Sequence, residues 1–295
     1  MGETPKKLDK YAKMVEKRLD ELFPNSESFA DDLFSACRYS LLGGGKRLRP
    51  FLCLTFYSLC GGMSEDAISF ASAIEMIHTY SLIHDDLPCM DDSDYRRGKL
   101  SCHKVYGYPQ AVLAGDALLN RAFEVLSSPL ANIQPSNVLS AMNAMAYASG
   151  IYGMIGGQMI DLSIEGKKCS KEQLWKMDEL KTAVLIAGAC KSGCCLAGAD
   201  ESKINAAYEY GKCLGVAFQI RDDMLDEAGD AALLGKPMGE DVKNGKNTFV
   251  SYYGMDKCEI LIAELTEKAI SYAESFGRGA AELKEIALWL TDRKY

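Results

Sequence analysis

The distribution of proline constrains the fold of this 295-residue chain more than any other feature. The chain has eight prolines and none between Pro135 and Pro237, so a long central stretch lacks the residue that most often ends a helix. Apolar residues recur at spacings of three and four, the period of an amphipathic helix, and β-branched residues show no strand-like alternation. The spacing predicts helices over 8–22, 27–42, 50–60, 65–87, 109–128, 136–166, 171–198, 203–228, 256–276 and 279–292.

The chain is continuous in composition. No linker rich in Gly, Pro or Ser divides it, and no repeat of fixed period is present. We therefore interpret residues 1–295 as a single all-α domain of about ten or more helices. Segment 125–160 carries no charge, but its Asn, Gln and Pro residues are too polar for a lipid-facing helix. We expect no transmembrane segment there, and a helix buried between protein surfaces fits better.

Composition argues against several classes of protein. The net charge of −8 argues against binding to nucleic acid or an anionic membrane. The eleven cysteines are odd in number and spread over a long chain, which argues against a disulfide framework. They lack any Cys-x-x-Cys spacing and the three histidines are scattered, which argues against a zinc site. Reduced thiols fit better. The N-terminus resembles neither a secretory signal nor a transit peptide, so we expect a cytoplasmic chain or one whose targeting peptide has been removed.

A first acidic block follows an otherwise apolar helical segment. It contains Asp85, Asp86 and Asp91, and basic residues follow it closely, including Arg96 and Arg97. An isolated Asp-Asp pair most often marks a solvated helix end. The block also lacks the central glycine and closing glutamate of an EF-hand. Taken alone, it indicates no particular site.

A second acidic block changes this interpretation. Asp222 and Asp226 are four residues apart and share one helix face, whereas Asp223 lies about 100° around the helix. Clustered carboxylates repel each other unless cations lie between them. Oxygen ligands without nearby histidine or thiolate favour Mg²⁺, which completes its shell with water and phosphate oxygens. Two such blocks facing each other would hold a polyphosphate ester through bridging metal ions.

Basic residues supply the other half of a phosphate site. A glycine-rich turn carries Lys46, Arg47 and Arg49 to a predicted helix start, where backbone amides also favour anions. A lysine inside a mainly apolar helix, as at Lys181-Thr182, is costly unless it meets an anion. Further candidates are Lys236 and Lys246, which follow glycines, and His78, whereas His84 is interpreted as a satisfied buried histidine. None of the Gly-Lys pairs has the spacing of a Walker loop.

The order and spacing of these blocks resemble the trans-prenyl diphosphate synthases over residues 10–295. The motifs are Arg38-Tyr-Ser-Leu-Leu-Gly-Gly-Gly-Lys-Arg-Leu-Arg-Pro50, Asp85-Asp-x4-Asp91 with Arg96-Arg97, Gly157-Gln158-x-x-Asp161 and Phe218-Gln219-x-x-Asp-Asp-x-x-Asp226. The segment before the first block resembles plant geranylgeranyl diphosphate synthases and the large subunit of heteromeric geranyl diphosphate synthases. The resemblance implies an all-α bundle around a deep central cavity, usually dimeric.

The resemblance also implies an activity and the residues that carry it. Such enzymes join isopentenyl diphosphate head-to-tail to an allylic diphosphate, with about three Mg²⁺ per site. The implied metal ligands are Asp85, Asp86, Asp91, Asp222 and Asp226. The implied residues for the allylic diphosphate are Arg96, Lys181, Thr182, Gln219, Lys236 and Lys246, of which Lys181, Gln219, Lys236 and Lys246 are expected to be catalytic. Those for isopentenyl diphosphate are Lys46, Arg49, His78 and Arg97.

Product length depends on the residues before the first acidic block. Ser81 lies one helical turn before Asp85 and Ile77 two turns before, so both are expected along the path of the growing tail. Ser81 is small enough to let the tail pass. Tyr80 is bulkier than the methionine expected from the plant family and either shortens the cavity or packs outward. C10 and C20 products both remain open.

Partner and compartment follow from the resemblance. Cys190 and Cys194 share a helix face, which fits core packing, whereas the resemblance implies subunit contact. The main interpretation is the catalytic large subunit of a heteromeric geranyl diphosphate synthase with a homologous small subunit, located in the plastid stroma. The alternative is a homomeric geranylgeranyl diphosphate synthase. A class I terpene cyclase is disfavoured, because its second metal motif normally reads Asn/Asp-x3-Ser/Thr-x3-Glu.

Overall fold

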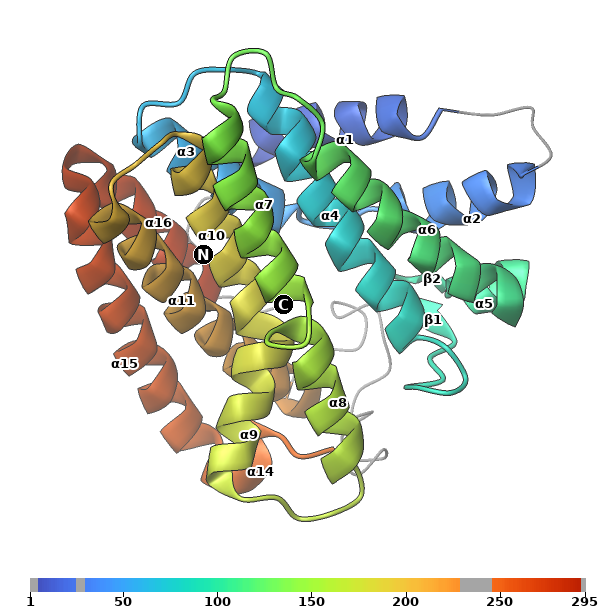
Figure 1. The fold of residues 1–295 in the computed structure, drawn as a ribbon. Coiled ribbons are helices and arrows are strands. Elements are labelled where there is room, and N and C mark those ends of the chain that lie inside the picture. Colours follow the sequence, from blue (N-terminus) through green and yellow to red (C-terminus); the bar gives the residue numbers. More distant parts are fainter. Residues whose placement is uncertain (1–4, 25–29, 229–245, 293–295) are drawn as a thin grey trace.

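The computed structural model describes residues 5–24, 30–228 and 246–292, which form an almost entirely helical bundle (Figure 1). Its α-helices are α1 (Lys6–Leu22), α2 (Asp31–Leu41), α3 (Leu48–Leu59), α4 (Asp66–Asp85), α5 (Cys102–Tyr106), α6 (Tyr108–Leu126), α7 (Pro135–Ser149), α8 (Met154–Ile164), α9 (Lys171–Asp178), α10 (Val184–Leu196), α11 (Glu201–Ala228), α14 (Phe249–Tyr253), α15 (Met255–Ala273) and α16 (Ala280–Thr291). A π-helical turn, η1 (Glu179–Ala183), joins α9 to α10, and a 3₁₀ turn, η2 (Glu274–Gly279), joins α15 to α16. The all-α prediction is confirmed.

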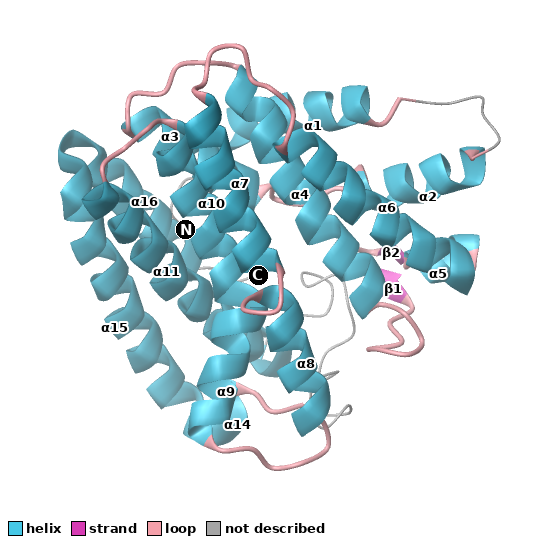
Figure 2. Cartoon of the chain, in the orientation of Figure 1, coloured by secondary structure: helices cyan, strands magenta, loops and turns pink. Residues whose placement is uncertain are grey.

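The elements missing from the prediction are all short. Strands β1 (Tyr95–Arg96) and β2 (Lys99–Leu100) pair antiparallel, and Figure 2 shows this small hairpin among the helices. Together with α5 and α14, these elements span too few residues to give a periodic signal. The helix predicted over 136–166 is instead two helices, α7 and α8. A tight loop separates them, and in it a Cβ at Gly153 would collide with the carbonyl of Ala148.

Helix α10 lies at the centre of the bundle. It packs against α3, α7 and α11, and every one of its residues except Lys191 is buried. On one side α4 packs against α3 and α6, and on the other α11 packs against α15 (Figure 1). The first acidic block begins at the last residue of α4, the second lies in the last turns of α11, and residues of both line one cavity.

The Cys190–Cys194 pair lies inside this core. Both thiols are fully buried on α10, and the Sγ of Cys194 lies 3.6 Å from the Sγ of Cys60 at the end of α3. Burial raises the pKa of Cys190 well above its usual range. The structure therefore supports core packing for these thiols, and a partner subunit could not touch them in this arrangement.

The environment of the uncharged segment 125–160 differs from the one expected from the sequence. No helix in the described part of the chain is both long and apolar enough to cross a membrane. However, α7 and α8 are buried on one side only. Large apolar side chains away from the core are exposed; they are Leu139, Tyr147, Ile151 and Tyr152, which we call the α7–α8 face. Within this single chain, the segment is therefore not buried between protein surfaces.

Candidate active site

A cavity of about 820 Å³ is bounded by the ends of α4 and α11, by α8 and by the turn η1. Its lining includes most of the residues that the sequence singles out, namely Lys46, Arg49, His78, Tyr80, Ser81, Asp85, Asp91, Arg96, Arg97, Lys181, Thr182, Gln219, Asp222, Asp226 and Lys246. Ile77 and Asp86 are not among the described residues that line the cavity, because both are buried behind its wall. Lys236 lies outside the described residues.

Two lysines contact carboxylates across the cavity. Lys181 Nζ lies 2.6 Å from Asp161 Oδ2 and 4.0 Å from Asp85 Oδ2. Lys246 Nζ lies 2.9 Å from Asp91 Oδ2. Burial opposes the charge of Lys181, but Asp85 and Asp161 outweigh it and raise the pKa of the lysine. Burial raises the pKa of Asp85, with Lys181 counteracting it. The cavity is thus a low-dielectric site in which each charge depends on its partner.

The motif from Gly157 to Asp161 explains how Lys181 is held. A Cβ at Gly157 would collide with the backbone of Lys181, so only glycine lets α8 pack directly on η1. Asp161 follows one turn later and meets the ammonium group. Gln158 also lines the cavity, and its buried Nε2 has no hydrogen-bond partner among the described residues. The sequence contains this motif, but the pairing of Asp161 with Lys181 could not be inferred from its spacing.

The second acidic block is connected to η1 by a chain of hydrogen bonds. Thr182 Oγ1 donates to Gln219 Oε1 at 3.0 Å, and Gln219 Nε2 donates to Asp223 Oδ1 at 2.9 Å. The backbone N–H of Phe249 donates to Asp223 Oδ2 at 2.8 Å. Asp223 lines the cavity as Asp222 does, although the two side chains lie about 100° apart around the helix.

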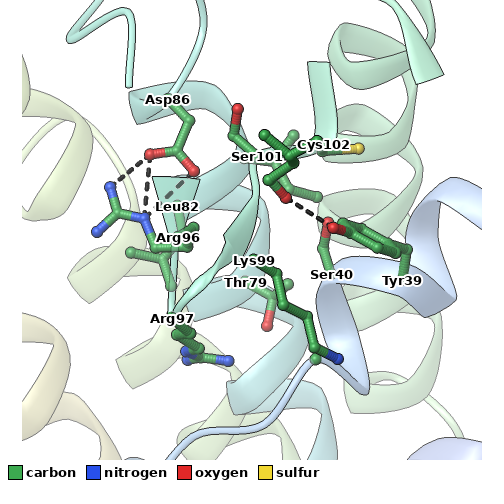
Figure 3. A pocket seen from close by; sticks show the side chains of 13 residues that line it. Tyr39, Ser40, Thr79, Leu82, Asp86, Arg96, Arg97, Lys99, Ser101 and Cys102 are labelled. Atoms are coloured by element: carbon green, nitrogen blue, oxygen red, sulfur yellow. Dashed lines mark hydrogen bonds and ion pairs between the residues drawn. The ribbon is translucent and has the colours of Figure 1, made fainter. Parts of the chain in front are cut away.

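Asp86 lines a different pocket from the other carboxylates. Its Oδ1 and Oδ2 accept hydrogen bonds from Arg96 Nε at 3.0 and 3.2 Å, beside a small pocket of about 30 Å³ that Tyr39 and Lys99 also line (Figure 3). Burial raises the pKa of Asp86, and the hydrogen bond from Arg96 opposes this. The carboxylate of Asp86 thus holds the arginine and is not among the described residues that line the larger cavity.

Another part of the cavity, which we call the basic end, gathers positively charged side chains. Lys46, Arg49 and Arg97 lie there with His78. Burial lowers the pKa of Arg49 to about 10, which leaves it charged at neutral pH. Burial and then the neighbouring arginines, Arg49 first, lower the pKa of His78 well below its usual range, so this imidazole is neutral. This end suits a polyanion bound directly by cations.

An apolar wall adjoins the acidic blocks. It is formed by side chains of α4, α8 and α11, among them Tyr80, Met154, Met159, Leu162 and Phe218. The Tyr80 ring lies edge-on to His84, and its buried hydroxyl has no hydrogen-bond partner among the described residues. Ser81 Oγ donates to the carbonyl of His78 at 2.9 Å, so its hydroxyl is satisfied within the helix.

The donor set fits Mg²⁺ only if phosphate contributes. Among the described residues, no three His, Cys, Asp or Glu side chains lie close enough to hold a metal ion on their own. Carboxylates instead come from two walls, and no imidazole or thiolate stands among the predicted ligands. Mg²⁺ commonly takes one or two carboxylates and completes its shell with water and phosphate oxygens. The side chains therefore suit metal ions that arrive with a diphosphate.

Comparison with known proteins agrees with this geometry. A family model described as Polyprenyl synthetase matches residues 31–279. The chain belongs to the polyprenyl synthetase family. It is 41% identical over 281 residues to the chloroplastic geranylgeranyl pyrophosphate synthase of Capsicum annuum, a match covering 95% of this chain and 76% of the relative. Like that relative, this member of the polyprenyl synthetase family is a prenyltransferase, a short-chain trans-prenyl diphosphate synthase, as the sequence predicts.

Two further relatives carry names that mention a subunit assembly or a bound metal ion. The chloroplastic heterodimeric geranylgeranyl pyrophosphate synthase large subunit 1 of Arabidopsis thaliana is 40% identical over 263 residues, covering 88% of this chain and 70% of the relative. The geranyltransferase of Helicobacter pylori, solved in complex with magnesium and isoprenyl diphosphate, has a TM-score of 0.83 and 31% identity. That match covers 98% of both chains.

Substitutions around Lys181 should change stability in opposite directions. In metal-free buffer at pH 7, Asp161→Asn should lower the free energy of unfolding by about 1–2 kcal/mol, because the buried ammonium loses its nearest partner. Asp85→Asn should raise it, because burial penalises the Asp85 charge. Since folding raises the pKa of Asp85, this gain should disappear as the pH falls below the ordinary carboxyl range. Urea denaturation measures both effects, and a stabilised Asp161→Asn would contradict the pairing.

Proposed function

We propose that this chain condenses isopentenyl diphosphate head-to-tail with dimethylallyl diphosphate or a longer allylic diphosphate, giving geranyl and/or geranylgeranyl diphosphate. The strongest support is that one cavity joins a basic end, two carboxylate walls and an apolar wall. The basic end suits a diphosphate bound by cations alone. The carboxylate walls suit a second diphosphate bound through divalent ions, and the apolar wall suits a prenyl tail.

Four carboxylates are the proposed metal ligands. Asp85 and Asp91 on one wall, with Asp222 and Asp226 on the other, would hold about three Mg²⁺ together with phosphate oxygens of the allylic substrate. When bound, the ions neutralise the charge that develops on the departing diphosphate. Asp86 contributes differently, because its carboxylate orients Arg96.

The allylic diphosphate is proposed to bind at the lysine side of the cavity. Lys181 and Lys246 now contact carboxylates, and a diphosphate between the walls would attract both ammonium groups. Arg96, Thr182 and Gln219 border the same space. Lys236 is assigned the same role from sequence alone.

Isopentenyl diphosphate is proposed to bind at the basic end. Lys46, Arg49 and Arg97 supply the positive charge. Because the pKa of His78 is far below neutrality, its imidazole adds no charge and is available to donate one hydrogen bond. Two diphosphates thus have separate sites within one cavity.

The reaction requires no nucleophilic side chain. The C–O bond between the allylic group and its diphosphate breaks, leaving an allylic cation. The double bond of isopentenyl diphosphate attacks this cation, and a proton then passes from the joined product to the released diphosphate. The cavity accelerates these steps by holding the two esters in reach of each other and by surrounding the developing charge with fixed cations.

A condensation assay tests the proposed function. The chain, incubated with isopentenyl diphosphate, an allylic diphosphate and Mg²⁺, should yield a longer prenyl diphosphate, and a chelator should abolish the product. Asp222→Asn should lower turnover at least about 100-fold with the fold intact. Asp256→Asn, an exposed aspartate at the start of α15, is the control and should have wild-type activity. Absence of product with every allylic substrate, alone and with a partner subunit, would exclude the function.

Product length should respond to the residues that line the cavity. Ser81→Phe should shift products towards geranyl and farnesyl lengths without abolishing condensation, because no diphosphate ligand changes. Tyr80→Ala should lengthen them, since Tyr80 faces the cavity. Ile77→Val is the control, because Ile77 is buried in the core. Chromatography of dephosphorylated products measures the distribution, and unchanged lengths in Ser81→Phe would refute this path for the tail.

We further propose that the α7–α8 face contacts a second subunit. Its exposed apolar side chains, with Ile151 77% and Tyr152 70% exposed, are costly in water. The occupant is a homologous small subunit or a second copy of the chain, and the name of the Arabidopsis relative supports the former. The chloroplastic names of two relatives support a plastid location.

Light scattering tests the subunit contact. The wild-type chain, alone or mixed with a homologous small subunit, should form a particle larger than a monomer. The double variant Ile151→Lys/Tyr152→Lys should remain monomeric. Lys257→Glu, a charge change on exposed α15, should assemble as the wild type does. Wild-type assembly by the double variant would place the contact elsewhere.

A further inference from the structure

A buried carboxylate behind the basic end has no role in the proposed chemistry. Glu75 lies on α4, one turn before His78, and is 1% exposed. Its Oε1 accepts a hydrogen bond from Arg47 Nη1 at 2.9 Å and lies 3.8 Å from Arg97 Nη2. Neither Glu75 nor Arg47 is among the described residues that line the cavity. Both therefore stand one layer behind the groups that would touch a diphosphate.

Arg47 fixes the glycine-rich turn. Besides Glu75, its guanidinium donates to the carbonyl of Leu41 at 2.8 Å and lies 3.5 Å from Glu16. Its backbone has a φ of +49°, a conformation that a residue other than glycine adopts only where its surroundings hold it. Because Lys46 and Arg49 flank this anchored residue, their positions depend on it.

Arg97 is pressed against the same turn. Its Nη1 donates a short hydrogen bond to the carbonyl of Gly44. Its guanidinium also covers Gly45, where an added Cβ would lie 2.8 Å from Arg97 Cζ. Gly45 has a φ of +127°, so both its conformation and its surroundings require glycine. The β1–β2 hairpin and the turn before α3 therefore meet where Glu75 faces both arginines.

Charge gives Glu75 a second effect. Burial lowers the pKa of Arg49 and of Arg97, and for both groups Glu75 is the main influence in the opposite direction. The cationic side chains of a diphosphate pocket repel one another when no anion is bound between them. A carboxylate behind the arginines offsets this repulsion without occupying the side where the diphosphate would bind.

We propose that Glu75, acting through Arg47 and Arg97, is the positioning residue of the isopentenyl diphosphate pocket. This inference rests on the proposed function. Loss of its charge loosens the turn and the hairpin arginine together, so the pocket for isopentenyl diphosphate is impaired while the allylic site on the lysine side keeps its contacts.

Affinity and kinetics together test this role. In Glu75→Gln, the calorimetric Kd and the KM for isopentenyl diphosphate should both rise at least about tenfold. The KM for the allylic substrate should change less than about twofold and kcat less than about threefold. A purely structural role would lower active-site concentration and leave both KM values unchanged. Glu16→Gln, which removes the exposed acid beside Arg47, is the matched control and should bind as the wild type does.

A second variant tests the inference if Glu75→Gln does not fold. Arg47→Gln/Glu75→Gln removes both charges of the buried pair, which is less costly than leaving one of them unpaired. It should show the same selective loss. Unchanged affinity for isopentenyl diphosphate in either folded variant, or equal loss for both substrates, would overturn the inference. A wild-type chain that binds isopentenyl diphosphate but forms no product would contradict the proposed function alone, whereas one that does not bind it would overturn both.

Discussion

Mutual compensation of buried charges in one cavity is the constraint on which this structure depends. Carboxylates from two walls and cations from four segments share a space in which burial penalises each unpaired charge. The contacts of Lys181 with Asp161 and of Lys246 with Asp91 balance part of this charge. Divalent ions and diphosphates carry the complementary charges, so the same side chains suit them as ligands.

The helical scaffold explains how these charges are brought together. Asp85 is the last residue of α4, and Asp222 and Asp226 lie in the last two turns of α11. A helix C-terminus carries partial negative charge, which disfavours a carboxylate and strengthens its demand for a cation. The buried α10 separates these helices and fixes the distance between their ends. The fold thus places carboxylates where nearby cations stabilise their negative charge.

The sequence predicts the helices and the chemical nature of the site better than its detailed contacts. Helical periodicity and the two acidic blocks are local patterns, so they are readable without coordinates. The orientation of Asp86 towards Arg96 depends on a hairpin too short to be predicted. The burial of Cys190 depends on which helices surround α10, and the role of Asp161 depends on close packing at Gly157. These features are set by tertiary contacts, which residue spacing does not encode.

The central claim is that the two acidic blocks hold one diphosphate jointly through metal ions. Crystals grown with inorganic pyrophosphate and Mn²⁺ in place of Mg²⁺ test this by anomalous scattering. We predict anomalous peaks within coordination distance of Asp85 or Asp91 and of Asp222, each also contacting pyrophosphate oxygens. Pyrophosphate bound in the cavity without anomalous peaks, or peaks confined to one acidic block, would contradict the account.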